Sequence, residues 1–268
     1  MRMKITVLGS ASGISMRGRG HTSVALESGN GLYVFDLGEP VGRELLARGL
    51  PVEHLKAAFV SHMHSDHAGG LFQFVKNLHL YHNHPDYLPQ VEEFVLALPA
   101  EAVEAVKAFM IASYMFPERT NVKVNYVEIT EGRCYEDENI TVDAFGTSHF
   151  EGLKEYLAGR GDEKGPRGEA FGFEIRGEDR RVVYSGDLGG IDDIIGRAAG
   201  ADLLLLEFGH LIPLEDNLRK LAGLGTRKII LTHIFPDYNE KTRELQETAD
   251  AVLPGVVTVA EDGLVFGL

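Results

Sequence analysis

The sequence predicts an α+β fold in which two β-sheets, each backed by helices, meet at a shared edge. Short apolar runs that are typical of strands alternate with helical patterns along the 268 residues. The two halves of the chain also resemble each other weakly, because "YVFDLGEPVGRELL" and "VVYSGDLGGIDDII" both pass from a strand through Asp and Gly into a helix. Each is followed by a strand that ends in histidine, "AAFVSH" and "KIILTH". Two similar layers would bring those strand ends together.

The predicted strands are short apolar runs found throughout the chain. In order they include "KITVLG", "TSVALES", "LYVFDLG", "AAFVSH", "ITVDAF", "AFGFEIR", "RVVYSG", "DLLLLE", "KIILTH" and "GVVTVAE". The first predicted helix, 40–48, has Pro40 near its first turn and Gly49 after its end, where these residues are favoured. Helical patterns also fit residues 70–77, 191–199, 214–222 and 239–251.

Residues 86–121 resemble an insertion of two helices that break near Pro99. Such an insertion would form a packing lobe or a dimer surface, or else a lid over a site. The stretch "GRGDEKGPRGE", 159–169, has the composition of a mobile loop. No linker rich in Pro, Gly or Ser divides the chain, so we expect one domain over residues 1–268, with a helical insertion at about 86–121.

Composition and charge argue against several classes of protein. The formal net charge is -14, which gives no overall electrostatic footprint for nucleic acid. Cys134 is the single cysteine, which excludes an internal disulfide and suits a reducing compartment. The longest apolar stretch, 94–116, is interrupted by Pro99 and by charged residues, so it cannot cross a membrane as one helix. We therefore expect a cytoplasmic protein.

The stretch "SHMHSDHAGG", 61–70, concentrates metal-ligating residue types directly after a predicted strand. Alternate side chains of an extended segment point to the same side, so His62 and His64 can converge on one ion. Asp66 and His67 follow the turn and can face a second ion beside the first. Two histidines that bind one ion from a helix are typically four residues apart, as in HExxH, whereas here they are two apart. The site therefore begins at a strand–loop junction and not on a helix.

Four ligands do not complete two metal sites, so further donors must come from elsewhere in the chain. His149, Asp187 and His233 lie at the ends of apolar strands and are suitable. Imidazole and carboxylate without thiolate fit Zn²⁺ or Mn²⁺, with Fe²⁺ as a further candidate. A loop that is rich in histidine by chance would not be accompanied by this set.

The pattern HxHxDH, followed by a later His, Asp and His, resembles the metallo-β-lactamase superfamily of binuclear metallohydrolases. The resemblance implies a four-layer αβ/βα sandwich with two divalent ions, Zn²⁺ above all, at one edge. It covers nearly the whole chain outside 86–121. The implied ligands are His62, His64 and His149 for the first ion, Asp66, His67 and His233 for the second, and Asp187 as a bridge.

The resemblance also implies a mechanism. Asp36 in "FDLG" matches an aspartate that orients the motif loop. Two cations about 3.5–4 Å apart lower the pKa of a bridging water and supply hydroxide near neutral pH. Asp66 or Asp187 would accept the hydrogen bond of this nucleophile, and the leaving group then needs a proton or a metal contact.

Within the superfamily, the chain is most similar to ribonuclease Z and related phosphodiesterases. "ITVLGSASGISMRGRGHTSVAL" resembles their opening strand and Gly-rich loop, and "FDLGEPVGRELLARGLPVEHLKAAFVSHMHSDHAGGL" resembles their next stretch. His210 precedes the last ligand at a spacing similar to that of their non-ligand histidine, which protonates the leaving oxygen. Glu207 would orient His210, although a purely structural histidine is the alternative.

The same opening loop contains candidates for substrate binding. Arg17, Arg19 and His21 either bind phosphate beside the metals or belong to a solvated loop. Three further histidines, His79, His82 and His84, lack a carboxylate pair and are expected at the surface or a pocket rim. The aromatic residues beside the site, such as Tyr184, are expected to pack in strand cores.

The chain departs from the ribonuclease Z pattern in one respect. Those enzymes carry a protruding arm, rich in Gly, Pro and basic residues, that grips tRNA, and the stretch taken to correspond here, 86–121, is acidic. A small phosphodiester or related ester is therefore preferred over nucleic acid. The alternatives are an acyl hydrolase, either a thioesterase of the glyoxalase II type or a lactonase, and a non-catalytic metal-binding scaffold, which would be expected to have lost ligands. A homodimer is compatible with the sequence.

Overall fold

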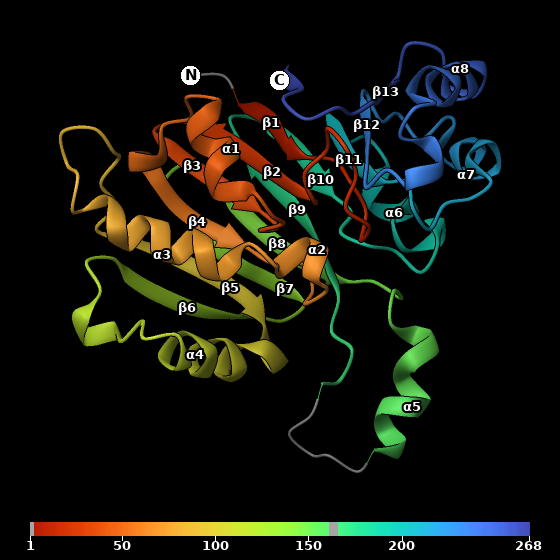
Figure 1. Ribbon diagram of the computed structural model, residues 1–268. Helices are drawn as coiled ribbons and strands as arrows, with labels where there is room; N and C mark the ends of the chain where they lie inside the picture. The colour runs from red at the N-terminus through yellow and green to blue at the C-terminus, as the bar shows by residue number, and fades with distance from the viewer. Residues whose placement is uncertain (1–2, 161–165) are drawn as a thin grey trace.

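Two seven-stranded sheets form the centre of the fold in the computed structural model, which describes residues 3–160 and 166–268 (Figure 1). The first sheet has the strand order β14-β1-β2-β3-β4-β5-β6, and the second has the order β13-β12-β11-β10-β9-β8-β7. The strands of the first sheet are β1 (Lys4–Gly9), β2 (Ser23–Ser28), β3 (Gly31–Phe35), β4 (Leu55–Phe59), β5 (Glu93–Pro99), β6 (Lys123–Ile129) and β14 (Val265–Gly267). Those of the second are β7 (Gly132–Glu136), β8 (Thr141–Gly146), β9 (Phe171–Gly177), β10 (Arg180–Tyr184), β11 (Leu203–Glu207), β12 (Ile229–Thr232) and β13 (Val257–Val259).

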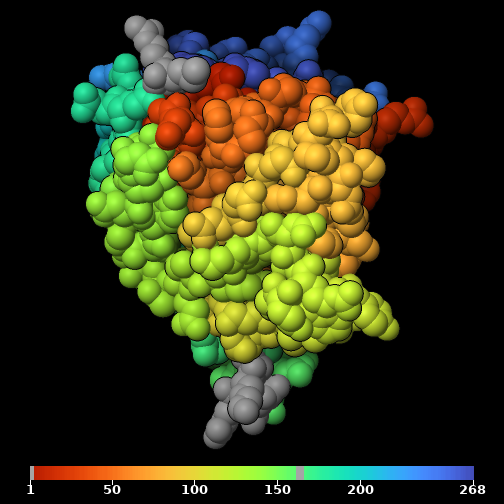
Figure 2. Space-filling view, turned by 90° about the vertical axis from the view of Figure 1, so that its left-hand side faces the viewer, coloured from red at the N-terminus to blue at the C-terminus, as the bar shows by residue number. Residues whose placement is uncertain are grey.

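Helices cover the outer faces of both sheets, so the molecule has the four layers that the sequence predicts (Figure 1). The helices are α1 (Val41–Ala47), α2 (Ser65–Ala68), α3 (Leu71–Tyr81), α4 (Val103–Ala112), α5 (Lys154–Gly159), α6 (Ile195–Ala198), α7 (Leu214–Leu221) and α8 (Thr242–Val252). Helices α1, α3 and α4 pack on the first sheet, while α6, α7 and α8 pack on the second. Figure 2 shows the molecule from one side, with the yellow chain segment that follows α3 towards the right-hand edge.

The strands explain the layering, because successive side chains of a strand point to opposite faces. In β3, Leu32 and Val34 join the core beneath the helices, whereas Tyr33 and Phe35 join the core between the sheets. Phe35 stacks on Phe59 with ring centroids 4.8 Å apart. Both faces of such a strand are buried, so apolar residues fill it continuously.

The predicted helical insertion at 86–121 is wrong in its first half. Residues Glu93–Pro99 form β5, which pairs in parallel with β4 and β6 inside the first sheet. The continuous apolar run "FVLALP" reflects a strand that is buried on both faces, and periodicity alone does not distinguish such a strand from a helix. Only α4 is an α-helix within the segment, and its Val103, Val106 and Met110 back the sheet.

A different segment projects from the body. After β8 the chain leaves the sheets, forms α5, and returns to begin β9 at Phe171 (Figure 1). The predicted loop 159–169 includes residues 161–165, which lie outside the described part of the chain. No helix among the described residues is long and apolar enough to cross a membrane.

The core between the sheets gives the first prediction. Phe173 on β9 is fully buried and lies against Phe35 and Phe59, with ring centroids 5.7 and 5.8 Å apart. Phe173→Ala should lower the free energy of unfolding by about 3–5 kcal/mol, because it leaves a cavity where both sheets meet. Urea denaturation would measure the change, with the exposed Tyr156→Ala as a matched control that should remain within about 0.5 kcal/mol of wild type. A loss for Phe173→Ala no larger than that of the control would contradict the prediction.

Candidate metal centre

The predicted donors come together where strands of both sheets end. The loop after β4 carries His62 and His64 and continues into α2, which holds Asp66 and His67. His149, Asp187 and His233 follow β8, β10 and β12 of the opposite sheet. The strand ends therefore meet at a shared edge, as the repeated pattern of the two halves indicates.

The seven side chains form two groups of potential metal donors. One ligand atom from each member lies within 4.8 Å of those of the other members of its group. The first group is His62, His64, His149 and Asp187, and the second is Asp66, His67 and His233. A further group, which overlaps both, joins His210 to Asp187 and His233. In the second group, Asp66 Oδ2 lies 3.4 Å from His67 Nε2 and 3.1 Å from His233 Nε2. Donors about 2.0–2.1 Å from a tetrahedral Zn²⁺ lie about 3.3 Å apart, so these separations fit a metal ion.

Asp187 lies between the two groups. Its Oδ1 is 3.2 Å from His67 Nε2, and its Oδ2 is 3.4 Å from His233 Nε2 and 3.8 Å from His62 Nε2. One carboxylate therefore reaches donors of both groups. The arrangement supports the bridging role that the family resemblance implies.

Unsatisfied polar atoms at this point test whether a cation fits. His62 Nε2, His67 Nε2 and Asp187 Oδ1 are buried and have no hydrogen-bond partner among the described residues. Such atoms are costly in a protein interior unless a ligand or water satisfies them. They are nitrogen and oxygen donors directed at common points, so a divalent cation fits the residues present.

Burial favours the neutral form of His62 and His149 in the first group, and hydrogen bonds favour the ionised form of Asp66 in the second. Burial lowers the pKa of His149 to about 4 and holds the pKa of His62 well below its ordinary value. Burial alone would raise the pKa of Asp66, but hydrogen bonds from His233 and His67 bring it below its usual range. Neutral imidazoles and an ionised carboxylate are the states in which these side chains coordinate a cation.

Asp36 is hydrogen-bonded to the motif loop that it is predicted to orient. Its Oδ1 accepts the backbone N–H of Ser61 at 2.7 Å, and its Oδ2 accepts the Ser61 hydroxyl at 2.9 Å and His67 Nδ1–H at 2.7 Å. The bond to Nδ1 leaves Nε2 of His67 free to act as a metal ligand. Tyr184 of the opposite sheet also donates its hydroxyl to Asp36 Oδ2, at 2.5 Å. Sequence reasoning treated Tyr184 as core packing and missed this bond, although its place at the end of β10, three residues before Asp187, was visible.

Glu207 and His210 form the predicted pair beside the donors. The buried Glu207 carboxylate accepts the backbone N–H of His210 at 3.0 Å and its ring Nδ1–H at 3.1 Å. This ring bond raises the pKa of His210. The His210 ring centroid is 4.9 Å from that of His149. The ring therefore lies beside the donor groups while its Nε2 is not held by Glu207.

The opening loop approaches the site, but Arg19 does not point at it. A Cβ built on Gly13 would be 3.6 Å from the Asp66 carboxylate, which places the loop against the second group. Arg19 instead donates to Ser10 Oγ and to the carbonyl of Ala260, both at 2.6 Å, and it also bonds Asn239 and Thr242. Arg19 therefore ties the loop to the C-terminal half, and the structure does not bring it to the donor groups.

The other two loop candidates have different positions. His21 bonds the carbonyl of Ser12 through Nδ1 at 2.9 Å and Ser15 Oγ through Nε2 at 3.2 Å, so it braces the loop. Arg17 is exposed, and its carbonyl receives a long contact from Asn239 Nδ2 at 3.4 Å. Neither belongs to the donor groups found among the described residues.

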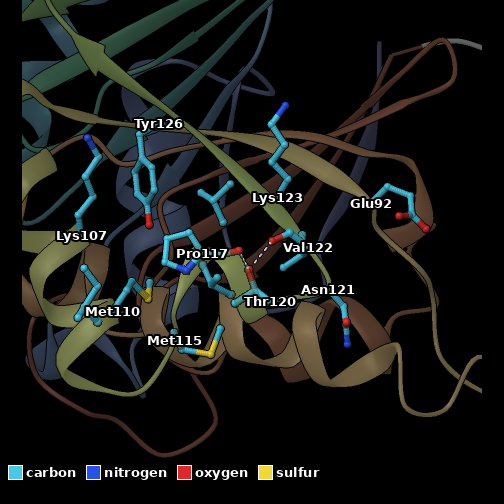
Figure 3. Close-up of a pocket in the computed structure, with 13 residues that line it drawn as sticks. Glu92, Lys107, Met110, Met115, Pro117, Thr120, Asn121, Val122, Lys123 and Tyr126 are labelled. Atoms are coloured by element: carbon cyan, nitrogen blue, oxygen red, sulfur yellow. Dashed lines mark hydrogen bonds between the residues drawn. The ribbon is translucent and has the colours of Figure 1, made fainter.

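The further histidines have structural surroundings. His79 Nδ1 accepts the backbone N–H of Asn121, and His82 Nε2 bonds the carbonyl of Val91, both at 3.0 Å. A cavity of about 430 Å³ between α4 and β6, lined by Met110, Met115 and Tyr126 among others, contains none of the predicted site residues (Figure 3).

Comparison with known proteins agrees with this geometry. A family described as "Beta-lactamase superfamily domain" matches residues 34–234. The chain is 26% identical to ribonuclease Z of Methanothermobacter thermautotrophicus over 97% of this chain and 95% of that protein. Its structure is similar to that of the metallo-beta-lactamase fold protein YhfI from Bacillus subtilis, with a TM-score of 0.77, 19% identity and 99% coverage of both chains. It is also similar to the short form of human tRNase Z, with a TM-score of 0.69, 20% identity and 98% coverage of both chains.

The two donor groups predict the metal content. Wild-type protein dialysed against Zn²⁺ should retain two equivalents, and Asp187→Ala should retain fewer, because it removes the carboxylate that both groups share. Elemental analysis of the dialysed proteins would measure this. Asp216→Ala, an exposed aspartate on α7, is the matched control. Two firmly held equivalents in Asp187→Ala would show that the carboxylate is dispensable.

The bond between Tyr184 and Asp36 gives a separate prediction. Tyr184→Phe keeps the ring but removes one donor from a buried carboxylate, so stability should fall by about 1.5–3 kcal/mol. Thermal or urea unfolding of metal-free protein would measure the change, and Tyr33→Phe, which removes the buried hydroxyl that donates to Asp137 Oδ2, offers a comparison away from the site. An unchanged midpoint for Tyr184→Phe would mean that Asp36 does not depend on this donor.

Proposed function

Because the match to the beta-lactamase superfamily domain spans most of the chain, the chain belongs to that family, and we propose that it is a metal-dependent hydrolase of phosphodiesters. The observation that carries the proposal is the Glu207–His210 pair beside the two donor groups. His210 lies outside the two predicted ligand sets, although it is within reach of Asp187 and His233. An imidazole in that place, held by a buried carboxylate, is suited to deliver a proton to a leaving oxygen.

The two groups described above would hold two divalent ions, with Zn²⁺ the expected metal and Mn²⁺ or Fe²⁺ as further candidates. The ions supply Lewis acidity for the substrate oxygen and lower the pKa of an attacking water. Asp66 or Asp187 would accept a hydrogen bond from that water. His210 would protonate the departing alkoxide through Nε2, while Glu207 holds Nδ1 and fixes the direction of the ring.

A small phosphodiester is favoured over a nucleic acid by the charges of the projecting segment. Its Lys154 pairs with Glu151, and Arg167 pairs with Glu169 at 2.6 Å. Paired cations contribute little to binding a phosphate backbone, and the net charge of -14 adds repulsion. The relatives named ribonuclease Z point to phosphodiester chemistry, and the charge distribution of this chain points to a shorter substrate than tRNA.

Two phosphodiesters that differ in the leaving group test the role of His210. Bis(p-nitrophenyl) phosphate releases a weakly basic phenolate, whereas diphenyl phosphate releases a more basic phenolate that depends more on protonation. With Zn²⁺- or Mn²⁺-loaded protein, His210→Ala should lower the rate about 10²–10⁴-fold for diphenyl phosphate and much less for the nitrophenyl ester.

The matched control is His54→Ala, an exposed histidine outside the donor groups, and it should retain wild-type rates. Equal losses for both substrates in His210→Ala would remove the assignment of a general acid. If metal-loaded wild type hydrolysed neither diester but did hydrolyse a thioester or a lactone, the proposed phosphodiesterase activity would be wrong and an acyl hydrolase activity would take its place.

A further inference from the structure

We propose that Phe150 is a positioning residue that fixes the imidazoles of His64 and His149 for the first ion. The inference rests on the proposed function only in that the first donor group holds a metal. It assigns to an aromatic residue outside the ligand set a control over the affinity of one ion of the pair.

Phe150 packs against every imidazole of the first donor group. Its ring centroid is 4.6 Å from that of His149, 4.9 Å from that of His64 and 5.6 Å from that of His62. The contacts with His64 and His62 are edge-to-face, a favoured arrangement for aromatic rings. No imidazole of the second group makes a ring contact with Phe150. Phe150 therefore acts on one donor group only.

The imidazoles differ in how polar groups hold them. His62 Nδ1 bonds Ser61 Oγ at 3.0 Å, and His67 Nδ1 bonds Asp36. Within the described part of the chain, the imidazole rings of His64 and His149 hydrogen-bond only to each other, at 3.3 Å between His64 Nδ1 and His149 Nε2. Ligating histidines normally have an outer hydrogen-bond partner that sets ring orientation. For the rings of His64 and His149, packing against Phe150 would set the orientation that an outer hydrogen bond sets elsewhere.

The segment that returns to β9 lies against Phe150 at Gly168. A Cβ built on Gly168 would lie 3.0 Å from Phe150 Cβ, so the returning segment crosses directly over it. Gly168 has a φ of +79°, which favours glycine, and a larger residue would meet both the backbone strain and the ring. The Glu101 carboxylate accepts the backbone N–H groups of Arg167 and Glu169, and Glu169 in turn accepts that of Glu101 at 3.0 Å. These bonds anchor the segment on the body of the protein.

Titration of Zn²⁺ into chelator-stripped protein, followed by calorimetry, tests the proposal without using activity. Phe150→Ala should weaken one of the two binding steps about 10–100-fold and leave the other unchanged. The visible spectrum of the Co²⁺ protein should change for the same step. Phe150→Leu, which keeps apolar bulk, should recover most of the affinity. Tyr156→Ala removes an exposed aromatic from the same projecting segment and should bind as wild type.

Wild-type values for both steps in Phe150→Ala would overturn the proposal, and so would an equal loss in both steps. Thermal unfolding of the stripped proteins identifies a variant that fails to fold. In that case the milder Phe150→Val should show the selective loss, and wild-type binding by Phe150→Val would overturn the proposal. Wild-type protein that binds no metal would overturn this inference and the proposed function together. Two tight sites that are insensitive to Phe150 would overturn this inference alone.

Discussion

The carboxylate of Asp36 is the interaction on which the site depends most. It stands at the end of β3, receives the backbone and side chain of Ser61 and the ring of His67, and accepts the hydroxyl of Tyr184 from the other sheet. Asp36 adopts a left-handed φ of +59°, a conformation that aspartate tolerates better than most residues. Four hydrogen-bond donors compensate the burial of this carboxylate. Removal of one donor would lower the stability of the protein, because a buried charge would lose a partner. The same carboxylate therefore links the second sheet to the motif loop at the shared edge of the sheets.

Around that carboxylate, several local features are unfavourable for the stability of the metal-free protein. Three donor atoms lie buried without hydrogen-bond partners among the described residues, and His233 has a left-handed φ of +56°. Both features would be disfavoured in a region selected for stability alone, and both fit a position where a ligand compensates. His210 is arranged differently, since its ring is tied to Glu207 on one side and has a side-chain exposure of 36%.

The sequence allowed the layered fold and all seven donors to be predicted, because their spacing after strands is local information. Asp36, Glu207 and His210 could be placed by resemblance alone. The error at 86–121 arose because β5 is apolar on both faces, which gives no alternation to separate it from a helix. The strand β6 was missed because Lys123, Asn125 and Glu128 make it look like a loop. The hydrogen bonds of Arg19 and Tyr184 could not be predicted, because the partners Ala260 and Asp36 are about 150 to 240 residues away in the sequence. Local sequence patterns do not indicate the direction of a single side chain.

The seven donors come from segments between His62 and His233 and belong to both sheets. A cation bound by them would cross-link segments more than 100 residues apart, as a disulfide does in secreted proteins of this size. The chain has one cysteine and cannot form such a link within itself. A bound ion differs from a disulfide in that its effect depends on concentration: at about a thousandfold excess over its dissociation constant it would add about 4 kcal/mol to stability. The free energy of unfolding would then rise and fall with the concentration of free metal ion. Depletion of the metal would weaken the contact between the two sheets without any change in the sequence.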